Sequence, residues 1–221
     1  RPAANPGEAA TAASLLKHWA GQDARSNVLG FYGHSRGEHR CFSNFYDHAK
    51  APFDFELPEE FLADGLGPVP LVVSCRFSEQ AIMLCKAAAM GDAENFGAVA
   101  AASSPEEAKA LGRSVRNFDA QLWDRIVCSV AFEVVYQKFH KSPALTPLLL
   151  GTGGRLIAEA TKNDRIWGVG VNCGDPRVCT PSEWQGSNIL GWALMEARTA
   201  LRGDGVGAAG GRKRRWQRDG G

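Results

Sequence analysis

Long hydrophobic runs are missing from this sequence of 221 residues. Charged residues or glycines interrupt every apolar stretch, so none reaches the ~18 to 20 residues that a membrane span requires. We therefore expect no transmembrane helix and no membrane partner. An excess of one charge sign is also missing, because 25 Lys and Arg stand against 24 Asp and Glu, a net charge of +1. Global charge does not attract the whole molecule to nucleic acid or to anionic membranes.

Cysteine pairs with the CxxC spacing are absent. The six cysteines are scattered, several of them among apolar neighbours, which favours an intracellular, reducing setting (cytoplasmic or nuclear) over a disulfide scaffold. His34, His39, Cys41 and His48 lie close in sequence, but their spacing matches no common zinc finger. We predict no metal site and no cofactor.

Several catalytic signatures are absent as well. The sequence contains no GxGxxG, P-loop, GxSxG or HExxH motif. Dinucleotide oxidoreduction, P-loop nucleotide hydrolysis, serine esterase chemistry and zincin proteolysis therefore have no support.

What is present divides the chain into three parts. Residues 1–29, rich in Ala and Pro, are predicted to form an N-terminal arm with a short helix near 12–20, packed on or near the domain. Residues 30–202 alternate helical patterns with short extended pieces and form the folded unit. Residues 203–221 are a Gly-rich tail with five basic residues against two acidic ones, a net charge of +3. This tail is the only concentrated basic segment, and we predict that it is disordered.

Hydrophobic spacing and capping residues predict a mainly helical domain with a few short strands. Ser78 is the expected N-cap of a helix over 79–90, Ser104 precedes a helix that ends near Leu111, and Asp119 precedes a long helix that crosses the core. The remaining expected segments are helices over 93–102, 143–150 and 188–201, strands over 71–76 and 155–161, and a solvated acidic loop or insertion over 53–70.

Two charged residues on the helix over 79–90 are candidates for chemistry. Glu79 lies in the first turn, where the helix dipole favours an ionised carboxylate that could act as a base, although acids are common at helix starts. Lys86 lies seven residues further on an apolar face. It could be a desolvated, nucleophilic amine or a phosphate ligand, or its stem could simply reach out to solvent.

A long loop over 163–187 carries the next candidates. Asn163 and Asp164 precede Trp167 and Gly168, which combines polar groups, an indole and flexible backbone in a platform suited to a nucleobase or sugar. An Asx turn beside a packed tryptophan explains the same residues equally well. Asn188 could donate to phosphate or ribose, or could be a plain N-cap.

Short motifs, read in order, resemble the NADAR family, also called YbiA-like. The resemblance spans residue 30 to about residue 202 and rests on the order and spacing of these pieces: Phe31-Tyr32, Phe42-Ser43-Asn44-Phe45, Ser78-Glu79-Gln80 with Lys86, Leu111-Gly112-Arg113, Trp123, Lys138-Phe139, Asn163-Asp164 with Trp167-Gly168, and Asn188-Ile189-Leu190-Gly191 with Leu194-Met195 and Arg198. The resemblance implies a single, multihelical YbiA-like domain.

The resemblance also implies an N-glycosidase that hydrolyses the bond between a phosphorylated ribose and an amino group of a base. The expected substrate carries ADP-ribose or ribose phosphate. Two substrate classes are associated with the family: ADP-ribose on guanine in DNA or RNA, and phosphoribosylamino pyrimidine intermediates of riboflavin synthesis. The basic tail favours the first class, because Lys and Arg clusters attract phosphates. A module that binds ADP-ribose without cleaving it is the alternative.

By motif, the functional glutamate, tryptophan and aspartate of the family fall on Glu79, Trp123 and Asp164, and its lysine falls on Lys86. Gln80 departs from the pattern, because family members often have histidine there. We predict Glu79, Lys86 and Asp164 as catalytic residues. The predicted substrate-binding residues are Phe31, Ser43, Asn44, Phe45, Arg113, Trp123, Asn163, Trp167, Gly168 and Asn188.

Overall fold

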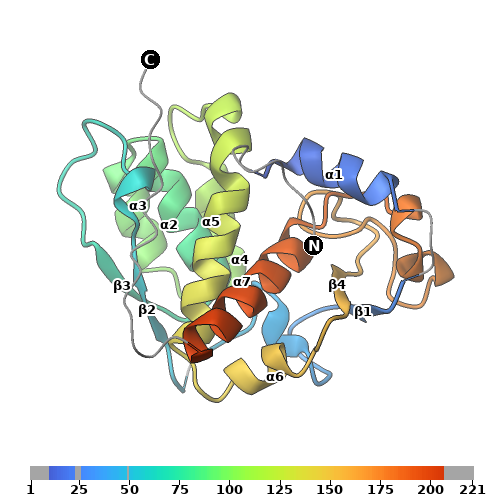
Figure 1. Ribbon diagram of the computed structural model, residues 1–221. Coiled ribbons are helices and arrows are strands. Elements are labelled where there is room, and N and C mark those ends of the chain that lie inside the picture. Colours follow the sequence, from blue (N-terminus) through green and yellow to red (C-terminus); the bar gives the residue numbers. More distant parts are fainter. Residues whose placement is uncertain (1–9, 23–25, 49, 207–221) are drawn as a thin grey trace.

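The computed structural model describes residues 10–22, 26–48 and 50–206, and its architecture is mainly helical, as the sequence predicts. Figure 1 shows α5 in the middle of the molecule, with α2, α3, β2 and β3 on one side and α7, β1, β4 and α1 towards the other. The helices are α1 (Ala12–Ala20), α2 (Ser78–Ala89), α3 (Ala93–Ala100), α4 (Pro105–Arg113), α5 (Ala120–His140), α6 (Thr146–Leu150) and α7 (Ile189–Val206). The strands are β1 (Val28–Phe31), β2 (Phe53–Glu56), β3 (Val72–Cys75) and β4 (Leu156–Glu159), and four short 3-10 helices complete the fold: η1 (Arg40–Phe42), η2 (Glu59–Phe61), η3 (Pro176–Cys179) and η4 (Pro181–Glu183).

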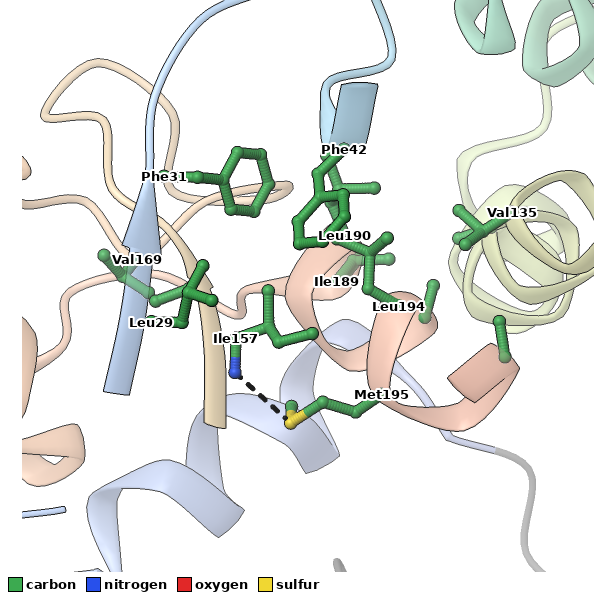
Figure 2. Close-up of a cluster of buried hydrophobic side chains, with 14 of the residues drawn as sticks. Leu29, Phe31, Phe42, Val135, Ile157, Val169, Ile189, Leu190, Leu194 and Met195 are labelled. Carbon is green, nitrogen blue, oxygen red and sulfur yellow. Dashed lines mark hydrogen bonds between the residues drawn. The ribbon is translucent and has the colours of Figure 1, made fainter. Parts of the chain in front are cut away.

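The buried apolar side chains form two clusters, one on each side of α5. Val130 and Val134 face the cluster built on α2, α3, β2 and β3, whereas Val127 and Val135 face the cluster built on α7, β1 and β4. Figure 2 shows side chains of this second cluster converging from the strands, η1, α5 and α7, with the Ile157 amide pointing at the sulfur of Met195. Trp123 and Trp167 pack against both clusters and therefore lie where the two meet.

The two sheets are small and each has two strands. β1 pairs with β4 in parallel, with Leu29 opposite Ile157 and Phe31 opposite Glu159. β2 pairs with β3 antiparallel, from Phe53 opposite Cys75 to Glu56 opposite Val72.

The expectation of a solvated loop over 53–70 is wrong for its first part. Phe53 and Phe55 are buried, whereas Asp54 and Glu56 between them are exposed, which is the period of two of a half-buried strand. Leu57 and Phe61 are buried as well. Asp54 and Glu56 lie on the exposed face of β2. The prediction gave weight to the run of negative charge and not to the alternation of apolar residues within it.

Helix starts follow local capping chemistry at two of the three predicted sites. Ser104 accepts a hydrogen bond from the Glu107 amide, and the Asp119 carboxylate accepts from Gln121 and Leu122. Ser78 is not a cap, because it is already the first helical residue of α2 and Phe77 occupies the N-cap position without a side-chain bond. The first turn of α2 is instead held by tertiary contacts.

Regular structure extends beyond both ends of the predicted folded unit, as α1 before it and as the last residues of α7 after it. α1 buries Leu15 and Trp19, and the Trp19 indole donates to the Ser187 carbonyl over 2.8 Å, so the described part of the arm packs on the domain. α7 buries Leu190, Leu194 and Leu201 and continues to Val206, into the segment assigned to the tail. Residues 1–9 of the arm and 207–221 of the tail lie outside the described part of the chain.

Candidate active site

An open pocket lies where the two core clusters meet. Its wall combines the segment that follows η1, the first turn of α2, one side of α4, the end of β4 and the loop that follows β4. Eight residues line it: Ser43, Asn44, Phe45, Glu79, Lys109, Glu159, Asp164 and Trp167. Six of them are predicted site residues, and they come from three segments that are distant in sequence and that the fold brings together.

Glu79 lies in the first turn of α2 and is only 6% exposed. Its amide donates to the Asn44 carbonyl over 3.0 Å, which fastens the helix start to the pocket wall. Burial raises the pKa of its carboxyl to about 7, and Asp164 adds to this, whereas Lys109, Arg113 and Lys86 act in the opposite direction. The cost of burying the charge therefore exceeds the attraction of three cations, and the group titrates near neutrality.

Asp164 combines the two roles that the sequence left open. Its Oδ1 accepts hydrogen bonds from the amides of Ile166 (2.9 Å) and Trp167 (2.7 Å), which is an Asx turn. The same turn presents the Trp167 indole to the pocket, and Asp164 itself lines the wall. Asn163 is exposed and does not line the pocket.

The segment after η1 is held by a buried lysine. Lys138 on α5 donates from Nζ to the Ser43 carbonyl over 3.1 Å, and burial lowers the pKa of this amine to about 8. The Ser43 hydroxyl in turn accepts from the Phe45 amide. The buried Oδ1 of Asn44 has no hydrogen-bond partner within the described structure, which makes it an unsatisfied acceptor beside the pocket.

The structure adds two pocket residues that sequence reasoning missed. Glu159 ends β4, and burial together with Asp164 and Glu79 raises the pKa of its carboxyl to about 8, against the effect of Lys109. Lys109 on α4 lies 5.3 Å from the centre of the Phe45 ring and acts electrostatically on both glutamates. The available signals were an acid within the apolar run of the strand over 155–161, and a lysine one turn before Arg113 on one helix face.

Lys86, Arg113 and Trp123 do not line the pocket but lie beside it. The Lys86 amine donates to the Gly112 carbonyl over 2.7 Å and lies 4.2 Å from the centre of the Phe118 ring and 5.7 Å from that of Trp123. Burial lowers the pKa of this amine, as does Arg113, whereas Glu79 raises it. Arg113 is exposed at the end of α4.

Three predicted binding residues do not line the pocket and make structural contacts in the fold. Phe31 is 5% exposed and packs edge-on against Phe42 in the core. A Cβ atom at Gly168 would lie 2.7 Å from the Glu159 carbonyl, so this glycine permits close packing of the loop on β4. Asn188 is fully buried. Its side-chain Oδ1 accepts a hydrogen bond from the Glu159 backbone amide, and its Nδ2 donates one to the Ile157 carbonyl. Gly168 and Asn188 thereby hold β4 and its loop, which carry residues of the pocket wall.

Metal and membrane features are absent from the residues that the structure describes. Within 10–22, 26–48 and 50–206, no group of three or more His, Cys, Asp or Glu side chains could hold a metal ion. In the same ranges, no helix combines the length and the apolar composition of a membrane span.

The fold and the pocket define a small helical domain with a carboxyl-rich site. The NADAR domain model matches residues 30–202, and the chain belongs to this family. N-glycosidase R617 of Acanthamoeba polyphaga mimivirus is 36% identical over 121 residues, which cover 55% of this chain and 71% of the relative.

Two further comparisons concern the fold and a second group of relatives. The solved structure of the E. coli protein YbiA covers 85% of this chain and 92% of its own, with a TM-score of 0.59 and 24% identity, and so has the same fold. The chloroplastic riboflavin biosynthesis protein PYRR of Zea mays is 33% identical over 106 residues, which cover 46% of this chain and 15% of that protein.

Proposed function

We propose that this chain hydrolyses the bond between ribose C1′ and nitrogen in guanine that carries ADP-ribose within nucleic acid. The chain is an enzyme, a hydrolase of N-glycosyl bonds, as its family and its relatives named N-glycosidase indicate. The observation that carries the proposal is the buried Glu79 carboxyl, whose pKa of about 7 lets it accept a proton at neutral pH.

The proposed mechanism uses the charge that develops on the sugar. Breaking a C1′–N bond gives the ribose ring oxocarbenium character, and a carboxylate beside it stabilises the transition state more than the ground state. Ionised Glu79 fills this role and takes a proton from the attacking water. Asp164 Oδ2 and the unpartnered Asn44 Oδ1 are suited to accept hydrogen bonds from ribose hydroxyls, and the Phe45 and Trp167 rings form flat walls.

Two cationic side chains near Glu79 are suited to bind the phosphates of a phosphorylated sugar. Lys109 and Arg113 lie one turn apart on α4, so they share a face of that helix. Both act on Glu79 electrostatically, which means that they lie close to the reacting carboxyl. We assign to them the phosphates that follow the ribose.

Lys86 offers a second route, in which the opened ribose forms a Schiff base with its amine. That amine donates a hydrogen bond to the Gly112 carbonyl, and Lys86 is not part of the pocket wall. The amine would have to break this hydrogen bond to reach C1′. We therefore propose direct attack by water. Borohydride added during turnover would trap an adduct on Lys86 only in the Schiff-base route.

Two observations bear on the choice of substrate. The basic residues of the tail, Arg212 to Arg215 and Arg218, favour a substrate within a nucleic acid. The similarity to PYRR favours a second candidate, a phosphoribosylamino pyrimidine intermediate of riboflavin synthesis. Both substrates present a ribose C1′–N bond to the same carboxyl.

The test is a release assay with the whole chain and two substrates, a DNA oligonucleotide with ADP-ribose on guanine and a phosphoribosylamino pyrimidine. We expect release of free ADP-ribose from the oligonucleotide, with a kcat/KM at least about tenfold above that for the pyrimidine, and a decline of this preference in high salt. A reversed preference would assign the chain to the second candidate. Tight binding of ADP-ribose without release from either substrate would contradict an enzyme and support a binding module.

A further inference from the structure

We propose that Glu159 is a catalytic acid that delivers a proton to the leaving nitrogen, a role that no sequence motif assigns to it. This inference rests on the proposed function and completes its mechanism. Glu159 lines the same pocket as Glu79 and Asp164, but it comes from a different element, the carboxyl end of β4. The pocket therefore holds three carboxyl groups that approach from α2, from β4 and from the loop after β4.

The backbone of Glu159 is fixed on all sides. Its amide donates to Asn188 Oδ1 over 3.1 Å, and its carbonyl accepts from the amides of Thr161 and Val169. β1 lies alongside, with Phe31 opposite Glu159 in the parallel register. A side chain that must transfer a proton needs such a rigid support, because small displacements reduce proton transfer strongly.

The carboxyl group itself has no partner in the described structure. Its Oε2 atom is buried and makes no hydrogen bond. An isolated buried carboxyl costs free energy when it is unpaired, and it costs most when it is ionised. Such a group in a pocket wall is expected to bond to a ligand, and in its neutral form it has a proton to give.

The charged groups around Glu159 keep it neutral at physiological pH. Asp164 on its loop and Glu79 on α2 raise its pKa in addition to burial, and only Lys109 on α4 opposes them, so that the pKa reaches about 8. The neighbouring β1 presents Phe31, and Asn188 lies just before α7; neither side chain is titratable. Burial and the two neighbouring carboxylates therefore favour the neutral, protonated form of Glu159, whereas the three cations near Glu79 favour its ionised form.

The other two carboxyls are less suited to this role. Asp164 already accepts two backbone hydrogen bonds at Oδ1, so it serves as an acceptor that shapes its loop. Glu79 is close to three cations that favour its ionised form, whereas only Lys109 acts in this direction on Glu159. Two carboxyls whose environments separate their pKa values are the usual arrangement for an acid and a base in one site.

The step balances as follows in atoms and electrons. The water oxygen bonds to C1′ while Glu79 takes one water proton. The C1′–N bond breaks, its electron pair stays on nitrogen, and nitrogen takes the proton of Glu159. The products are ribose with a hydroxyl at C1′ and the free amino group of the base, and exchange with solvent returns the proton from Glu79 to Glu159.

The experiment compares Glu159→Gln with the wild-type chain on two substrates whose leaving groups differ in their need for this proton. One is the oligonucleotide with ADP-ribose on guanine, and the other is ADP-ribose with a 4-nitrophenoxy group at C1′, whose C1′–O bond breaks to release 4-nitrophenolate without protonation. We expect Glu159→Gln to lose about 10² to 10⁴-fold in kcat on the first substrate and less than about fivefold on the second. Glu79→Gln, the matched control, should lose activity on both.

Two further readouts separate chemistry from structure. The decline of kcat/KM above about pH 8 with the guanine substrate should be missing in Glu159→Gln, because the titrating acid is gone. Formate added to Glu159→Ala should restore part of the lost rate with the same substrate. The unfolding temperatures of both variants establish that they are folded.

The contrary results are distinct. Equal losses on both substrates, or full activity of Glu159→Gln on the guanine substrate, would overturn the acid role of Glu159 and leave the proposed function intact. Inactivity of the wild-type chain on both substrates would overturn the proposed function, and the role of Glu159 with it.

Discussion

Glu79→Gln should stabilise the folded chain at pH 8, relative to wild type, by about 3 kcal/mol more than it does at pH 4. The carboxyl has an ordinary pKa of 4.5 and a pKa of about 7 when folded. The folded state therefore binds this proton more tightly than the unfolded chain does. The stability of the wild-type chain then falls as the pH rises from about 4.5 to about 7, and glutamine removes this contribution.

Urea unfolding at pH 4 and pH 8 measures this difference. Glu106→Gln on α4 is the matched control, because the same chemical change at an exposed side chain should leave the pH dependence as it is. Equal pH dependence in Glu79→Gln and wild type would show that Glu79 ionises freely in the fold, and it would remove the electrostatic basis for its role as a base. Stabilisation by the loss of a reactive group is typical of functional sites.

Gly191→Ala should have the second large effect, a loss of about 1 to 3 kcal/mol in the free energy of unfolding. A Cβ atom at this first-turn position of α7 would overlap the Ile157 carbonyl and the side-chain amide of Asn188. The neighbour is backbone of β4, which cannot move aside without breaking its pairing with β1. The clash also reaches the site, because Asn188 holds the amide of Glu159.

Thermal unfolding of Gly191→Ala and of Gly203→Ala tests this expectation. Gly203 lies in the same helix, and a Cβ atom there meets nothing within 4 Å. Alanine at an open helical position is favourable by up to about 1 kcal/mol, so this control should unfold at the same or a higher temperature. Equal unfolding temperatures for the two variants would contradict the close approach of α7 to β4.

Local signals account for most of the helices that the sequence predicts. Ser104 and Asp119 cap their helices through contacts within three residues, so their effect can be read from the sequence alone. β2 was missed because its acids at alternate positions resemble a solvated loop, and its strand character depends on burial of Phe53 and Phe55 against another element. The pairing of β1 with β4 joins residues far apart in sequence, which no local pattern contains.

In the candidate site, too, some residues could be predicted from the sequence, whereas the significance of others depends on the tertiary structure. Glu79 and Asp164 were predicted from the helix start, the loop chemistry and the family resemblance, and the pocket contains both. Glu159 has no local signal beyond an acid in an apolar strand, because its significance depends on which groups the fold packs around it. Asn188 was predicted as a substrate-binding residue, and in the structure its buried side-chain amide bonds to the backbone of β4, a contact that only the tertiary structure reveals.

The central claim is that the Glu79 carboxylate performs the chemistry of this pocket, and single-turnover hydrolysis tests it most directly. The guanine-linked substrate would be mixed with excess enzyme, and its dissociation constant measured in the same buffer, for wild type and Glu79→Gln. We predict that the variant binds within about threefold of wild type and cleaves at least about 100-fold more slowly, because the base is lost while the shape is kept. Cleavage by Glu79→Gln at the wild-type rate would contradict the claim.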